Sequence, residues 1–259
     1  MRARASTGIV LCSVVWLGGC QGLSERQRRW LAEGEGAYAQ GQDSQAVQQL
    51  TRLIDDAPNR PETARARYVR ALALARSGQR LQARTDLTRC AEKTADRDLR
   101  WRAHAMLGTI DFEDGQWASA SRFYTLALEG APPAPPTDTL LFRLGLSCER
   151  GGRWSQARRF FERLVREFPT SELTAVAQRR LQINADHYAV QCGVFASPRN
   201  AERMVRDLQR DGVQAYTQTE TRGGTPVQVV LVGRFAAYED ALRELARVKG
   251  FVPKAVLWP

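Results

Sequence analysis

Residues 107–132, LGTIDFEDGQWASASRFYTLALEGAP, carry the pattern that decides the fold of most of this chain. Apolar residues recur at helical spacing on both sides of Gly115, and Pro132 follows the second apolar segment. Glycine commonly ends a helix, and proline cannot continue one. The stretch therefore predicts two amphipathic helices joined by a turn at Gly115.

The same pattern recurs with a period of 37 residues. Each unit has a small residue in its first helix, a turn glycine, an alanine in its second helix and a large apolar residue one turn after that alanine. In order, these four sets are Gly34, Ala71, Gly108 and Gly145; Gly41, Gly78, Gly115 and Gly152; Ala46, Ala83, Ala120 and Ala157; and Leu50, Leu87, Tyr124 and Phe161. The small residues let paired helices approach closely while the large ones fill the space between units, which predicts a stacked solenoid.

This spacing resembles the tetratricopeptide repeat (TPR), whose unit of about 34 residues is lengthened here in the connection between units. We assign four TPR-like repeats to residues 20–169 and a capping helix with a linker to residues 170–186. The sequence departs from the family at its aromatic position in the first helix, which holds Ala37, Leu74, Asp111 and Cys148. The resemblance implies a protein or peptide partner on the concave face. We expect Trp117 and Trp154, which occupy equivalent positions in successive units, to pack in the core.

From residue 187 the helical period gives way to short alternating runs. They predict strands at 187–195, 213–220, 227–232 and 254–258, and helices at 198–211 and 238–249. The two halves repeat each other at a separation of 40 residues, as Val190, Gly193 and Phe195 match Val230, Gly233 and Phe235. Such a βαββαβ order predicts an α+β ferredoxin-like domain with both helices on one face of an antiparallel sheet. The protein is thus multidomain, with an all-α solenoid before this domain.

The segments VQCGVFASPRNAERMVRDL (190–208) and VVLVGRFAAYEDALREL (229–245) resemble the sporulation-related repeat (SPOR) domain, which we assign to residues 187–259. The resemblance implies binding to septal peptidoglycan whose glycan strands have been stripped of stem peptides. The family often has Arg at the place of Val229 and Pro at the place of Arg234.

Strand alternation directs Val190 and Cys192 to the helices and Gln191 to the other, open face. The amide of Gln191 suits the hydroxyl and N-acetyl groups of a sugar chain, and the family's serine at the place of Ser197 borders the glycan groove. An arginine would meet the lactyl carboxylate that stripping exposes. The predicted glycan-binding residues are Gln191, Gly193, Ser197, Arg199, Tyr216, Leu231, Arg234 and Trp258. Gly193 is expected to leave room for a ring, Tyr216 and Trp258 to offer flat walls, and Ser197 to cap the helix that follows it.

Residues 1–19 are predicted to be a signal peptide, because Arg2 and Arg4 precede an apolar run of about ten residues, too short to span a bilayer. Leu17-Gly18-Gly19-Cys20 resembles the bacterial lipobox, which implies acylation of Cys20. The family's inner-membrane retention signal is an Asp at the next position, and Gln21 stands there instead. The resemblance therefore implies the periplasmic side of the outer membrane.

Composition excludes other classes of protein. The formal net charge is +10, but acidic residues interleave with the basic ones, so we predict a solvated surface and no nucleic-acid partner. Cys90, Cys148 and Cys192 fall on predicted core positions and lack metal spacing. His104 has no partner at triad spacing. We therefore predict no catalytic residues, metal or cofactor.

Together these patterns predict a non-enzymatic outer-membrane lipoprotein adaptor. Its SPOR domain would bind denuded glycan at the division septum, and its solenoid would recruit a protein in cell division or wall remodelling. Three other classes of protein compete with this prediction. A cell-wall hydrolase fails because the sequence has no carboxylate, Cys-His or metal constellation. In a periplasmic envelope-assembly scaffold the solenoid would do most of the binding and the SPOR domain would be a tether. An RNA-binding module would need stacking aromatics on the central strands, where Gln191 and Leu231 stand.

Overall fold

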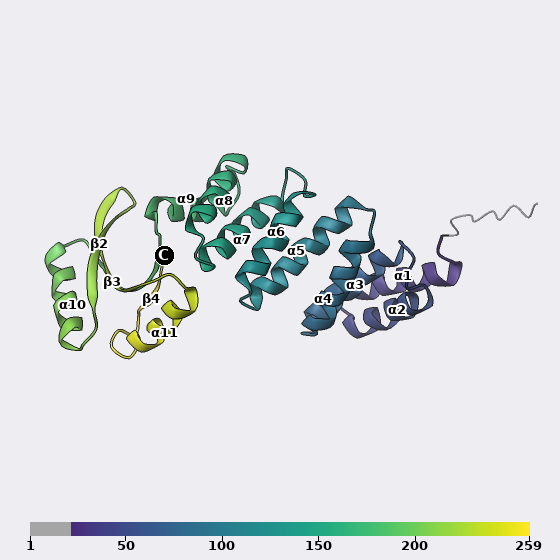
Figure 1. Cartoon of the computed structure of the whole chain (residues 1–259), viewed down its shortest axis with the longest axis horizontal. Helices are drawn as coiled ribbons and strands as arrows, with labels where there is room; N and C mark the ends of the chain where they lie inside the picture. Colours follow the sequence, from purple (N-terminus) through teal and green to yellow (C-terminus); the bar gives the residue numbers. More distant parts are fainter. Residues whose placement is uncertain (1–21) are drawn as a thin grey trace, which may run out of the picture.

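The computed structural model describes residues 22–259, so the predicted signal peptide and Cys20 lie outside the described residues. Helices stack in pairs along one long axis, from α1 at one end to the small mixed domain at the other (Figure 1). The paired helices are α1 (Glu25–Ala39) with α2 (Asp43–Asp56), α3 (Thr63–Arg76) with α4 (Arg80–Lys93), α5 (Arg97–Glu113) with α6 (Trp117–Leu128), and α7 (Thr137–Arg150) with α8 (Trp154–Glu167). The predicted all-α solenoid is confirmed.

The turn glycines end the first helix of every pair in the left-handed conformation. Their φ angles are 77° at Gly41, 78° at Gly78, 72° at Gly115 and 72° at Gly152. Side chains with a Cβ rarely adopt this conformation, so glycine is the residue that allows the tight turn. The 37-residue period of the sequence is therefore a period of the backbone.

Small and large residues pack against each other within each pair, as predicted. A Cβ placed on Gly34 would lie 2.5 Å from Leu50 Cγ, and one on Gly145 would lie 2.5 Å from a ring carbon of Phe161. The alanines of the second helices are buried, with Ala46, Ala83 and Ala120 fully so. Removal of this apolar surface from water is what holds the helices together.

One departure from the family pattern is compensated by charge. Asp111 is buried at the position that is usually aromatic, and it forms an ion pair with Arg84 of the preceding pair. An unpaired buried carboxylate would be strongly destabilising. Arg84 therefore compensates for Asp111 and links two neighbouring repeats.

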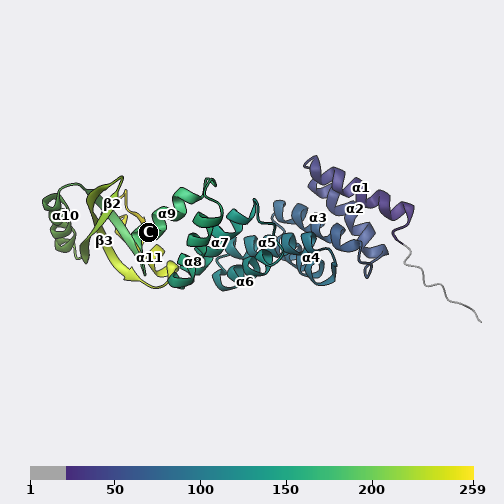
Figure 2. The same ribbon diagram turned by 90° about the horizontal axis from the view of Figure 1, so that it is seen from above.

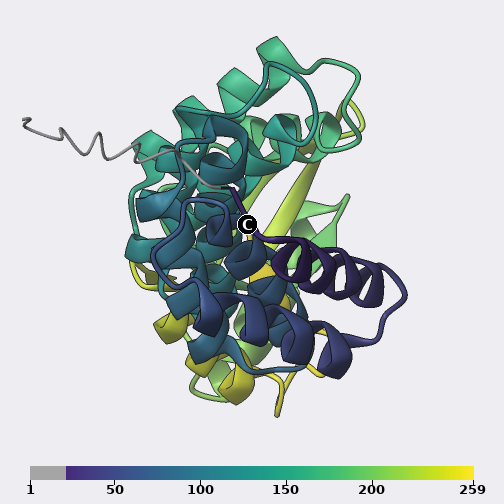
Figure 3. The ribbon, with the colours of Figure 1, turned by 90° about the vertical axis from the view of Figure 1, so that its right-hand side faces the viewer.

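The first helices line the inner side of the curve, because α1 contacts α3 and α3 contacts α5. Figure 2 shows the array from above, and Figure 3, which looks along its length, places α1 and α2 nearest the viewer. The array ends with α9 (Thr174–Ile183), which packs on α8. In the described part of the chain, no helix is both long and apolar enough to cross a membrane.

The C-terminal domain has the predicted βαββαβ order. Its elements are β1 (Tyr188–Phe195), α10 (Pro198–Arg210), β2 (Ala215–Arg222), β3 (Thr225–Phe235), α11 (Tyr238–Val248) and β4 (Val256–Trp258). The strands form an antiparallel sheet in the order β2-β3-β1-β4. Val190, Leu208 and Val248 share one buried cluster, so both helices cover the same face of the sheet.

The two domains meet through aromatic side chains, which corrects the prediction for Trp117 and Trp154. Both are half-buried, and neither is enclosed in the repeat core. The ring of Trp154 lies 4.8 Å from that of Tyr188 in β1, and the ring of Trp117 lies 5.7 Å from that of Tyr238 in α11. Trp117 and Trp154, at equivalent positions of two successive repeats, therefore connect the solenoid to the C-terminal domain.

Candidate functional site

The face of the sheet opposite α10 and α11 is the candidate site, and only half of it is open. Ala189, Val229 and Leu231 on this face are fully buried, together with Trp258. Ile183 and Ala185, at the end of α9 and just after it, pack against them. The expectation that Leu231 and Trp258 lie on an open face is therefore wrong, because the segment before β1 folds back over the sheet.

The open half of this face is organised by a chain of polar contacts that begins at Trp258. The indole Nε1 of Trp258 donates to Glu220 Oε1 at 2.5 Å, although β1 and β3 separate their strands. Glu220 Oε2 accepts from Arg222 at 2.9 Å, and Arg222 Nη2 donates to Gln191 Oε1 at 2.8 Å. Gln191 lies on the predicted face, half-buried, with its amide oriented by Arg222.

Gly193 faces the helix-covered side of the sheet, whereas the open side was expected. The pairing of β1 with β3 shifts between Gln191 and Gly193, and such a bulge breaks the alternation of side chains. A Cβ on Gly193 would lie 2.7 Å from a ring carbon of Phe195 and 3.0 Å from Met204 Sδ. The residue therefore makes room for the core beneath α10, and the expectation that it makes room for a ligand is wrong.

Tyr216 and Arg234 are engaged at the closed end of the sheet. The hydroxyl of Tyr216 donates to the carbonyl oxygen of Gly233 at 3.3 Å and lies 3.1 Å from His187 Nε2. Burial raises the pKa of Tyr216, so its hydroxyl keeps its proton. Arg234 is exposed and forms an ion pair with Asp186 at 3.4 Å. The hydrogen bond from His187, with Arg234 nearby, lowers the pKa of Asp186.

Ser197 and Arg199 stand at the start of α10, in the helical layer. Ser197 is the N-cap residue, but its side chain accepts no capping hydrogen bond. Arg199 is exposed in the first turn. Since α10 covers the opposite face of the sheet, the structure does not bring these two residues together with Gln191.

A groove lies beside the open half of the face, between α9 and the hairpin of β2 and β3. It encloses about 730 Å³. Arg179, Gln182 and Ile183 of α9 line one side, and residues 218–224 line the other. The lining is rich in amide and guanidinium groups, which suit a hydrated polar ligand better than an apolar one.

Sequence reasoning missed this groove, although part of the signal was present. Gln218, Glu220 and Arg222 have the same parity as Tyr216 along β2, which places them on the same face. The contribution of Arg179 had no local signal, because it depends on how α9 packs against another domain.

The solenoid carries a second candidate surface on its first helices. A groove of about 510 Å³ runs across α5, α7 and residues 171–173, which directly precede α9. Phe112, Phe142 and Leu146 supply its apolar surface, and Asp138 and Arg143 its charges. Its mixture of apolar and charged groups suits an amphipathic peptide segment.

The cysteines of residues 22–259 lie in the core. Cys90, Cys148 and Cys192 are free and buried. Burial raises the pKa of Cys90 to about 12 and that of Cys192 to about 11. In residues 22–259 no group of His, Cys, Asp and Glu side chains has the geometry of a metal site.

Two family models match parts of the chain. The model of the SPOR domain matches residues 184–257, and a tetratricopeptide repeat model matches residues 139–171. No curated protein matches the chain.

Solved structures resemble the helical part. The structure described as MamA RS-1 ArsTM double mutant is 16% identical, with a TM-score of 0.52, and the match covers 63% of this chain and 85% of that one. MamA AMB-1 P212121 is 19% identical with a TM-score of 0.51 and coverages of 61% and 80%. The apo form of RapI is 16% identical with a TM-score of 0.52, but only 46% of its length is covered. At these identities the likeness concerns the fold alone. The chain therefore contains a tetratricopeptide repeat and a C-terminal SPOR domain.

Proposed function

We propose that this protein is a non-enzymatic adaptor that binds peptide-free peptidoglycan strands through its SPOR domain and a protein partner through its solenoid. It is anchored by acylated Cys20 to the periplasmic side of the outer membrane and acts at the division septum, in cell division or wall remodelling. SPOR domains bind peptidoglycan and TPR repeats bind proteins, which supports the adaptor role.

The observation that carries the glycan part is the polar groove beside Gln191. A sugar chain presents hydroxyl and N-acetyl groups, so its site needs both donors and acceptors at close range. Gln218 on the hairpin and Gln182 on α9 supply such groups, and Arg222 holds the Gln191 amide in place.

The arrangement of the domains supports a role between membrane and wall. The N-terminal helix α1 lies at one end of the molecule and the SPOR domain at the other (Figure 1). A lipid on Cys20 would therefore lie at the end far from the glycan site, with the solenoid as a spacer between them.

A periplasmic envelope-assembly scaffold is the second candidate function. The groove across α5, α7 and residues 171–173 favours it, because aromatic and aliphatic side chains make up more of its lining than of the lining of the groove beside the SPOR sheet. In this alternative the SPOR domain would be only a tether.

Binding to isolated cell walls tests the glycan part. The full-length chain, purified in detergent, is mixed with intact sacculi and with sacculi that an amidase has stripped of peptides. More protein should sediment with the stripped sacculi. Equal sedimentation with both would contradict the proposal.

Cellular experiments test the location. A fluorescent fusion should gather at the septum of dividing cells, whereas an even outline of the cell would favour the scaffold. Cys20→Ser should abolish labelling by a palmitate analogue. Unchanged labelling and membrane fractionation of this variant would reject the lipid anchor.

A further inference from the structure

The groove beside the SPOR sheet is built from two domains. Its hairpin side lies within the residues that the SPOR model matches, 184–257. Arg179, Gln182 and Ile183 on the other side precede that range and belong to α9, the last helix of the solenoid. A SPOR domain cut from this chain would lose that wall.

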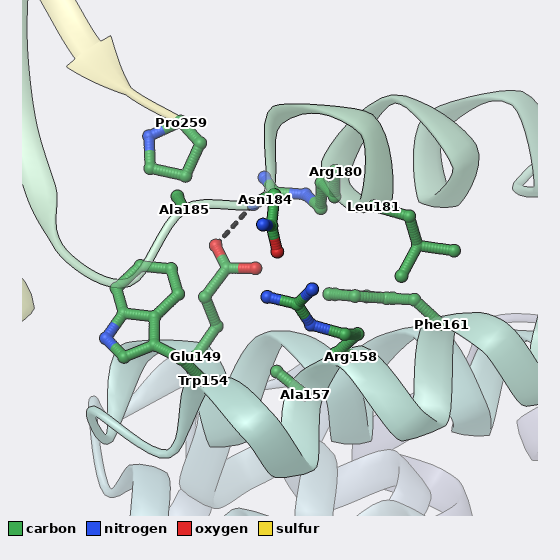
Figure 4. Close-up of a pocket in the computed structure, with 10 residues that line it drawn as sticks. All are labelled: Glu149, Trp154, Ala157, Arg158, Phe161, Arg180, Leu181, Asn184, Ala185 and Pro259. Carbon is green, nitrogen blue, oxygen red and sulfur yellow. Dashed lines mark hydrogen bonds and ion pairs between the residues drawn. The ribbon is translucent and has the colours of Figure 1, made fainter.

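The position of α9 against the sheet is fixed by contacts on both of its sides. Arg180 forms an ion pair with Glu149 of α7, whose side chain is only 5% exposed. Ile183 packs on the sheet beside Leu231 and Trp258. Between α8, α9 and Pro259 there remains only a cavity of about 20 Å³, which has room for about one water molecule (Figure 4). The wall is therefore packed in place next to the sheet.

The two arginines of the groove differ in what they leave for a ligand. Arg222 is already paired with Glu220 and hydrogen-bonded to Gln191, so its charge is largely compensated. Arg179 is exposed, and within residues 22–259 its side chain makes no ion pair and no hydrogen bond. Arg179 is thus the cation in the groove that is available to an anionic group.

Stripped glycan offers one kind of anion. Its hydroxyl and N-acetyl groups are neutral, and the negative charge lies on the lactyl carboxylates that removal of the stem peptides exposes. In intact peptidoglycan the same carbonyl carbon is part of a neutral amide. An arginine in the groove would therefore distinguish the two forms by the charge directly beside the sugar ring, because the carboxylates of an intact stem peptide lie farther along the peptide.

We propose that Arg179 of α9 pairs with a lactyl carboxylate of the bound glycan, so that the solenoid's last helix supplies part of the glycan site. This inference rests on the proposed function and adds to it a residue outside the SPOR domain. The solenoid thereby takes part in selecting stripped strands, in addition to binding its own partner.

An experiment on the full-length chain, designed like a double-mutant cycle, tests this pairing. One partner, the arginine, is changed by mutation, and the other, the carboxylate, is changed chemically. The proteins are the wild type, Arg179→Gln and the control Arg203→Gln, which removes another exposed, unpaired arginine from α10 on the opposite face of the sheet. The ligands are amidase-stripped sacculi and the same sacculi after carbodiimide coupling of their carboxylates to ethanolamine. This coupling makes the carboxylates neutral without restoring the peptides.

Arg179→Gln should weaken binding to stripped sacculi about fivefold, because one charge-assisted contact is lost at an exposed site. Arg203→Gln should bind like the wild type. On the neutralised sacculi all three proteins should bind alike. The inference is overturned if the two variants behave alike on stripped sacculi, or if the loss for Arg179→Gln persists after neutralisation. If the wild type itself fails to prefer stripped over intact sacculi, the proposed function and this inference fail together.

Discussion

Trp117 in α6 donates its indole N–H to Glu239 in α11 at 2.7 Å, and this bond joins the solenoid to the SPOR domain across 122 residues of sequence. Arg150 lies beside it, with its guanidinium carbon 4.7 Å from the ring centres of Phe112 and Trp117 and 4.6 Å from that of Tyr238. A cation between three aromatic faces is favourable for all of them. The two domains are therefore held in one orientation by a specific cluster.

Loss of that cation should loosen the junction. Arg150→Ala removes interactions worth about 1–2 kcal/mol at a half-buried site. The distance between spin labels at Thr125→Cys in α6 and Arg206→Cys in α10 should then spread over a broader distribution in pulsed electron paramagnetic resonance. Leu81→Ala changes an exposed site in α4, far from the junction, and is the control. The distance distribution should stay narrow in this variant. An unchanged distribution in Arg150→Ala would show that the cluster does not set the orientation.

Two glycines of α1 test the packing rule of the repeats. Gly34→Ala places a methyl 2.5 Å from Leu50 Cγ, whereas Gly36→Ala meets nothing within 4 Å. Both changes favour the helix itself by about 0.5–1 kcal/mol. Gly34→Ala should nevertheless lower the free energy of unfolding by about 1–3 kcal/mol through overpacking, while Gly36→Ala should raise it slightly. Denaturant titrations measure both, and equal effects would refute close packing at Gly34.

The sequence predicts features that depend on local pattern and fails where distant segments meet. The turn glycines and the pairing of Gly145 with Phe161 follow from a period that each repeat contains. Gly193 was misassigned because a bulge in one strand pairing has no mark in the sequence of β1 alone. The burial of Trp258 was missed because Ile183, which packs in the same cluster, belongs to the segment before the SPOR domain. Arg179 was missed for the same reason.

Thiol reactivity should report the burial of the cysteines. Only the thiolate reacts with disulfide reagents, so the raised pKa values of Cys90 and Cys192 slow the reaction at pH 8. In a chain that lacks residues 1–20, and so has neither Cys12 nor Cys20, we expect almost no colour from Ellman's reagent before unfolding and three thiols after it. Raising the pH from about 7 to 9 should speed the reaction of the unfolded chain, whose thiols titrate near 8.5, far more than that of the native protein. Rapid labelling of the native protein would contradict the burial.

Adjacent residues of β1 test the face assigned to the glycan. Gln191→Ala should weaken binding to stripped sacculi, because it removes the amide that meets the sugar. The domain should stay folded, because Gln191 is only half-buried and Arg222 keeps its ion pair with Glu220. Val190→Asp should unfold the domain, because Val190 is fully buried in the cluster that includes Leu208 and Val248. A lost sugar hydrogen bond costs about 1 kcal/mol, or about fivefold in affinity, and an unpaired buried carboxylate costs several times more in stability.

The contrast between these two variants separates function from folding. Gln191 pairs with Leu231 and Val190 with Val232, so the two side chains belong to opposite faces of the same strand. The melting temperature, measured by circular dichroism, should therefore fall in Val190→Asp, and sedimentation with stripped sacculi should fall in Gln191→Ala. If Gln191→Ala lowers the melting temperature as much as Val190→Asp does, its amide serves mainly to hold Arg222. If it leaves both stability and binding untouched, the ligand lies elsewhere on the groove, and Arg179 and the hairpin must bind it without β1.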